Sequence, residues 1–114
     1  MKINNDLYGG FIVSKNALKG IPILYSYRQK SSIKELNGWN ILSEIDDENY
    51  VSESSNFLIV NAESIYKIAP VLFEIFDADY GTDLFWKYQE NVHIGFYDLI
   101  NECDTDIDQI LKKK

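Results

Sequence analysis

The residues that could support catalysis are few and lie apart in the chain. One histidine, His93, and one cysteine, Cys103, are present, and neither belongs to a nucleophile motif. His93 stands in an alternating segment on the side opposite Val92 and Ile94, which predicts a surface or edge histidine rather than a general base. Cys103 lies in a polar linker. We therefore expect no cysteine–histidine chemistry, and a single cysteine allows no internal disulfide.

Acidic residues offer a second kind of chemistry, because carboxylates can bind a cation or act as a hydrolytic pair. Glu44, Asp46 and Glu48 alternate as in a calcium loop, but the glycine and the later bidentate acid that such a loop needs are missing. A hydrolytic pair would need a concave pocket holding two acids, for instance Asp77 or Asp79 with Glu44, and nothing marks any acid as buried. We expect no metal site, no cofactor and no enzymatic activity.

The charge of the chain restricts its partners. Among 114 residues there are 11 Lys and Arg and 18 Asp and Glu, so the net charge is -7. Nucleic acids and anionic membranes bind clustered cations, so we expect neither as a partner. A basic protein partner suits this charge, because opposite charge steers association. The N-terminus lacks a signal-peptide pattern and no apolar run is long enough to span a membrane, which predicts a cytoplasmic protein.

The clearest functional pattern is a run of carboxylates beside aromatic residues. We name residues 44–53 the acidic segment; no Lys or Arg occurs between Glu35 and Lys67. Tyr and Trp dominate interface energetics, and eight Tyr and two Trp exceed what a core of this size needs. The alternative is that many of them border the core with their polar atoms in water. The predicted partner-binding residues are two anchors, Trp39 and Tyr50, with Glu44, Asp46, Asp47, Glu48 and Tyr80 around them.

A single α+β domain, residues 1–114, must position these residues, because the chain is too short for two cores. Strand-like runs group at both ends of the chain with helices between them, which favours a mostly antiparallel sheet of five or six strands with helices on one face. The predicted strands are residues 9–13, 21–28, 39–44, 57–60, 84–88 and 92–97. The predicted helices are residues 15–19, a helix after Asn61, a second from Pro70, and a C-terminal helix within 104–114.

Local signals refine these elements. Asn61 can cap the helix that follows it. Thr105 and Asp108 have capping-box spacing at the C-terminal helix. A strict alternation places Ile23 and Tyr25 on the same side of their strand.

Several residues stand in a distinctive order along the chain: the run Gly9–Ser14, Tyr27, Arg28, Gly38, Trp39, Ser43, the acids Glu44 to Glu48, Tyr50, Asn56, Ile65, Pro70, Asp77, Gly81 and Phe85. This order resembles one bacterial family, the immunity protein thirty-three family, over about residues 9–97. None of these residues is a catalytic signature. The resemblance implies a cytoplasmic immunity protein of a polymorphic toxin system, which neutralises a toxin by binding it.

Two functions from different classes follow. The leading hypothesis is a stoichiometric inhibitor whose acidic segment faces a basic surface of a cognate toxin. The alternative is an interaction or regulatory module, unrelated to toxins, that binds through an exposed sheet edge. Salt separates them, because a steered acidic inhibitor loses association rate as salt rises and an apolar site does not. An enzyme with paired carboxylates is a third and lesser possibility.

Overall fold

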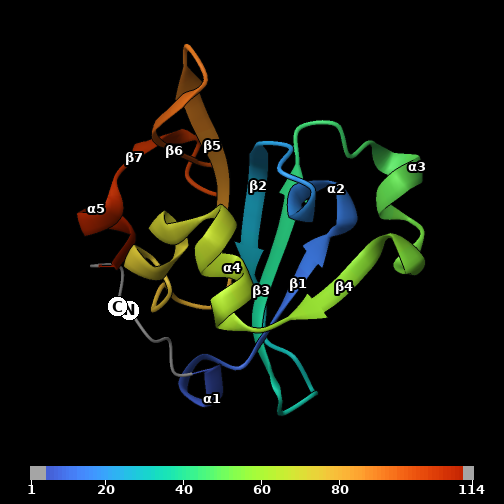
Figure 1. The fold of residues 1–114 in the computed structure, drawn as a ribbon. Coiled ribbons are helices and arrows are strands. Elements are labelled where there is room, and N and C mark those ends of the chain that lie inside the picture. The colour runs from blue at the N-terminus through green and yellow to red at the C-terminus, as the bar shows by residue number, and fades with distance from the viewer. Residues whose placement is uncertain (1–4, 112–114) are drawn as a thin grey trace.

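A computed structural model describes residues 5–111. These residues form one seven-stranded sheet in the order β4-β1-β3-β2-β5-β6-β7 (Figure 1). The pairings are antiparallel except for that of β1 with β3, which is parallel. The strands are β1 (Gly10–Ser14), β2 (Ile23–Arg28), β3 (Leu36–Ser43), β4 (Phe57–Val60), β5 (Asp83–Gln89), β6 (Val92–Asp98) and β7 (Cys103–Thr105).

Short helices connect the strands, and α4 lies across one face of the sheet in Figure 1. Asn61 caps α4 as predicted, because its Oδ1 accepts a hydrogen bond from the Ser64 backbone N–H at 3.0 Å. Among the residues described, no helix is long and apolar enough to cross a membrane. The helices are α1 (Asn5–Tyr8), α2 (Lys15–Leu18), α3 (Glu48–Val51), α4 (Ala62–Ile68) and α5 (Ile107–Leu111), with 3-10 turns η1 (Ser54–Asn56) and η2 (Pro70–Glu74).

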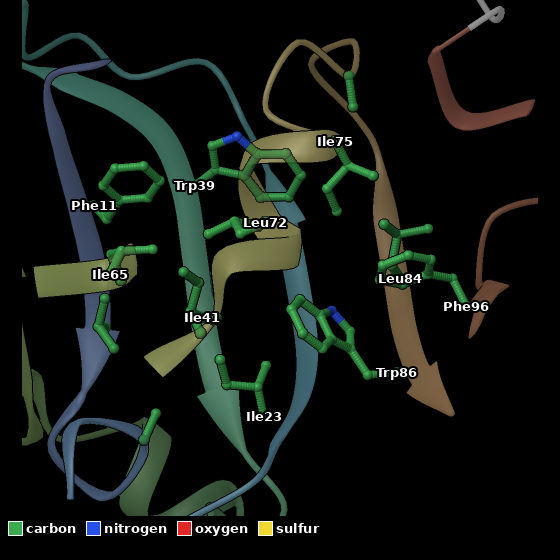
Figure 2. Close-up of a cluster of buried hydrophobic side chains, with 14 of the residues drawn as sticks. Phe11, Ile23, Trp39, Ile41, Ile65, Leu72, Ile75, Leu84, Trp86 and Phe96 are labelled. Carbon is green, nitrogen blue, oxygen red and sulfur yellow. The ribbon is translucent and has the colours of Figure 1, made fainter. Parts of the chain in front are cut away.

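The core lies between one face of the sheet and the segment containing α4 and η2 (Figure 2). Both tryptophans are buried there with their indole N–H groups satisfied: Trp86 Nε1 donates to Ser26 Oγ at 2.7 Å and Trp39 Nε1 to the Phe76 carbonyl at 3.1 Å. Each fully buried large side chain contributes roughly 1.5–3 kcal/mol. The fully buried apolar side chains include Phe11, Val13, Trp39, Ile41, Ile65, Leu72, Ile75 and Leu84.

The opposite face of the sheet carries half-exposed side chains, among them Ile12, Tyr27 and Tyr97. The prediction that Ile23 and Tyr25 share a side is wrong. A bulge between them in the β2–β3 pairing puts Ile23 in the core, while Tyr25 lies half-exposed on the opposite face. A period-two pattern does not reveal such a bulge.

The structure adds one strand to the predicted five or six. The additional strand, β7, pairs with the end of β6 through three residues, of which Cys103 and Asp104 are exposed. The predicted capping box of the last helix is also wrong, because Asp106 caps α5 by accepting from the Gln109 N–H at 2.9 Å. Residues 112–114 of the predicted C-terminal helix lie outside the described range.

Candidate partner-binding surface

The acidic segment leaves the end of β3 and returns to the sheet at β4. Glu44 and Glu48, two of the predicted partner-binding residues, are exposed. Asp47 is exposed too, but its Oδ1 accepts from the Tyr50 N–H at 2.8 Å and so caps α3. Its charge lies at the positive end of this short helix, where an acid is favourable. Asp47 therefore has a structural role in addition to its charge.

The Asp46 carboxylate is hydrogen-bonded to other parts of the fold, which the sequence does not indicate. Its Oδ2 accepts from the Ser43 N–H at 2.7 Å, and its Oδ1 accepts from Asn16 Nδ2 at 2.8 Å. Partial burial alone would raise the pKa of this carboxyl, but the hydrogen bonds outweigh it and lower the pKa. Asp46 thus remains ionised and ties the start of the acidic segment to α2.

Tyr50 closes the other end of the acidic segment. Its backbone carbonyl accepts from Asn56 Nδ2 at 2.9 Å, and its half-buried ring lies 6.3 Å from the ring of Phe57, the first residue of β4. These contacts hold α3 and η1 together ahead of β4. The Tyr50 ring is only partly available to a partner.

Trp39 does not belong to the exposed surface, which corrects the prediction of an aromatic anchor. Its side chain is 0% exposed and lies on the core face of β3 beside Ile41. A strand pattern gives the side on which a residue lies but does not tell which side is covered. Trp39 supports the surface from within the core.

Tyr80 is 53% exposed, but it lies far from the acidic segment. Its ring approaches Gly38 near the start of β3, since a Cβ built on Gly38 would stand 3.0 Å from it. The acidic segment begins with Glu44, after the other end of β3. Ser43 lies five residue steps along β3 from Gly38, which corresponds to roughly 17 Å. The seven predicted residues therefore do not form one continuous patch.

The side chain of Arg28, which we name the arginine clasp, holds the region around Tyr80 in place. Arg28 donates from Nε to the Asn37 carbonyl at 2.9 Å and from Nη1 to the carbonyls of Phe76 and Ala78 at 2.7 and 3.0 Å. Its guanidinium carbon also lies 4.8 Å from the centre of the Tyr80 ring. Charged donors to carbonyls make strong hydrogen bonds. The clasp fastens the loop before β5 to strands β2 and β3.

Apolar residues accompany the acids on the surface, and sequence analysis did not single them out. Ile45 in the acidic segment is 56% exposed, and Leu58 and Ile59 in β4 are 47% and 65% exposed. The run Phe57–Val60 is continuously apolar, which is also typical of a buried central strand. The structure places β4 at the end of the strand order, which the sequence alone does not show.

The residues considered for catalysis do not assemble. Asp77, Asp79 and Glu44 are exposed, and Asp79 belongs to the Tyr80 end of the sheet. Cys103 is exposed. In the part of the chain that the structure describes, no three His, Cys, Asp or Glu residues gather as a metal would require.

His93 is not the surface histidine that the alternation predicts. A bulge between Lys87 and Tyr88 in the β5–β6 pairing changes the register, and His93 packs against Trp86 and Phe96 with ring centres 4.9 and 4.8 Å away. Burial lowers the pKa of His93 more than a hydrogen bond with the Gly95 backbone raises it. The half-buried imidazole therefore favours its neutral form.

A hollow of about 230 Å³ contains a second pair of carboxylates, Asp83 and Asp98. Burial, followed by the charge of Asp98, raises the pKa of Asp83. Asp98, however, accepts hydrogen bonds from the backbone N–H groups of Ile100 and Asn101 and from Asn101 Nδ2. Its carboxylate is thus used to form the turn after β6.

Comparison with known proteins adds the class of the molecule. A family model that describes immunity proteins matches residues 11–94, which is most of the chain. The chain belongs to this family, the immunity protein Imm33 domain. The match confirms the resemblance noted in the sequence. No curated protein and no solved structure matches the chain.

Proposed function

We propose that this protein is a cytoplasmic, non-enzymatic immunity protein that neutralises a cognate toxin by direct one-to-one binding. The observation that carries the proposal is membership of the Imm33 family over residues 11–94. The binding surface is the acidic segment together with the exposed side chains of β4. Exposed acids and exposed apolar side chains adjoin here. The acids would attract a basic partner, and the apolar side chains would supply the contact area that holds it.

Charge is the main selective feature of this surface. Residues 36–66 contain six acids and no Lys or Arg. Glu44, Glu48 and Glu53 are exposed, and the structure uses none of them as a helix cap through its side chain. A concentration of one sign of charge raises association rates by about 10- to 1,000-fold for an oppositely charged partner. We infer that the toxin presents a basic surface to this segment.

Coexpression with the product of the neighbouring gene, as the candidate toxin, tests the proposal. We expect protection of the cells and a one-to-one complex on purification. The charge-neutral triple variant Glu44→Gln, Glu48→Gln and Glu53→Gln should slow association about tenfold or more and reduce its dependence on salt. The control triple changes the same number of exposed acids elsewhere, at Glu74, Glu90 and Glu102.

The control variant should associate at nearly the wild-type rate, because its net charge changes equally but the acidic segment is intact. Equal slowing by both triples would show that total charge acts and the acidic segment does not. Absence of both protection and complex would refute the immunity function for that toxin.

A second candidate is an interaction module that binds a partner other than a toxin. The exposed Leu58 and Ile59 on the outer strand favour it. An apolar edge strand can bind an extended segment of any protein, whether or not that protein is a toxin. It predicts an association rate that hardly changes between low and physiological salt.

A further inference from the structure

The outer edge of β4 is open to an additional strand. Strand β4 ends the strand order and pairs with β1 alone, so backbone N–H and C=O groups along its other edge have no strand partner within residues 5–111. Proteins normally protect such edges with Lys, Pro, a bulge or a covering element. Phe57–Val60 contains neither Lys nor Pro, and its register with β1 is regular over all four pairs.

Side chains on both faces of β4 are available to an added strand. The register pairs Ile59 with Ile12 on the half-exposed face and Leu58 with Val13 on the core face. Val13 is fully buried, yet Leu58 remains 47% exposed and Ile59 65% exposed. A shallow hollow of about 580 Å³ beside Ile59 adds room for a side chain. An added strand with alternating apolar residues would cover both side chains.

The charges around β4 select the occupant. Glu53 precedes the strand and Glu63 follows it, and both are exposed. A second copy of this chain, paired antiparallel through β4, would bring the Glu53 end of one strand toward the Glu63 end of the other. Like charges facing across strands are destabilising. An extended segment with Lys or Arg at its ends meets opposite charge at both ends instead. Lys34 and Glu35 both line the hollow, so together they add no net charge to it.

We propose that β4 binds its partner by strand addition, and that the partner segment is a short apolar strand flanked by Lys or Arg. This inference rests on the proposed function, because it identifies the segment of the toxin that the immunity protein would hold. Backbone hydrogen bonds to β4 supply affinity, Leu58 and Ile59 select alternating apolar side chains, and the acids fix the ends.

The test uses a synthetic β-hairpin peptide closed by D-Pro-Gly, with alternating Val and Thr and with Lys at the strand ends. A second hairpin carries Glu at the same positions. Binding is followed by backbone amide NMR and by amide hydrogen exchange of the full chain. We expect the Lys-ended hairpin to shift and protect amides within residues 57–60, and to bind at least tenfold more tightly than the Glu-ended hairpin.

Two variants locate the site. Ile59→Lys places a charge on the β4 edge and should weaken binding of the Lys-ended hairpin at least fivefold. Val92→Lys is the matched control, because Val92 is equally apolar, is 62% exposed, and lies where β6 pairs with β5 alone. It should bind like the wild type. A dispersed amide spectrum for each variant shows that it is folded.

The proposal is overturned by no protection at residues 57–60, by equal binding of both hairpins, or by equal effects of the two variants. These outcomes are separate from those of the toxin experiment. A toxin complex that forms equally well with Ile59→Lys would refute strand addition and leave the immunity function standing. Hairpin binding at β4 without any toxin complex would support strand addition and refute the immunity function for that toxin.

Discussion

Replacing Arg28 by Ala should be among the most damaging single changes to this protein. The side chain makes three hydrogen bonds to the carbonyls of Asn37, Phe76 and Ala78, and it stacks on the ring of Tyr80. Alanine removes all of these contacts; the Phe76 carbonyl keeps its hydrogen bond from Trp39 Nε1, while the carbonyls of Asn37 and Ala78 lose the Arg28 donor. The loop before β5 then loses its attachment to β2 and β3.

The expected cost follows from these contacts. A hydrogen bond from a charged donor is worth roughly 1.5–3 kcal/mol net, but Arg28 is only half-buried and water can reach some of the freed carbonyls. We therefore count about 1 kcal/mol for each of the three bonds, or about 3 kcal/mol in all. Arg28→Lys keeps the charge without the fork of donors, and it should lose about half as much.

Urea unfolding measures this loss. With a slope of about 1.5–2 kcal/mol/M, a loss of about 3 kcal/mol lowers the midpoint by about 1.5–2 M. The control is Lys87→Ala, which removes a 2.9 Å ion pair with Asp104 whose side chains are 36% and 69% exposed. Exposed pairs contribute little, so this control should change stability by no more than about 0.5 kcal/mol. If the urea midpoint of Arg28→Ala lay as close to that of the wild type as the midpoint of Lys87→Ala does, this reasoning would be refuted.

Three further predictions concern single side chains, each checked by urea unfolding. Gly38→Ala should lower the free energy of unfolding by at least about 2 kcal/mol, because φ is +92° and the new Cβ would stand 2.5 Å from the Gln29 carbonyl oxygen. A folded variant within about 0.5 kcal/mol of the wild type would contradict this prediction. Asp46→Ala should cost about 1–2 kcal/mol at pH 7. Because folding lowers the pKa of Asp46, this contribution is complete above about pH 4 and disappears as the pH falls through the lower folded value, so wild type and variant should converge in acid. His93→Phe should remove the loss of wild-type stability that begins below about pH 6.5, because a folded pKa below the unfolded one makes protonation favour unfolding; an unchanged pH profile would show that His93 is not the group responsible.

The sequence was sufficient to predict most strands and several caps, because these depend on neighbouring residues. Asn61 is an example, since a cap needs only a side-chain oxygen and the N–H groups just after it. The hairpin of β5 and β6 was predictable for the same reason, and Glu90 and Asn91 form its turn with positive φ.

What the sequence left undetermined depends on distant contacts. The two bulges move Ile23 and His93 to the core face, and nothing in the alternation marks them. Trp39 was predicted as an anchor because aromatic residues suit interfaces and cores alike. In the acidic segment all carboxylates look equivalent in sequence, yet Asp46 is bound to Asn16 on another element, while Glu44 is exposed.

The parallel pairing of β1 with β3 determines the order in which this half of the sheet can be completed during synthesis. Strand β1 leaves the ribosome before either of its neighbours, and it must wait for residues 36–43 before it has a parallel partner. The β2–β3 hairpin joins strands that are adjacent in sequence, so its loop closure costs less than that of β1 with β3. Until residues 57–60 follow, β1 is an edge strand of the nascent sheet, and an unpaired strand edge favours aggregation of the incomplete chain.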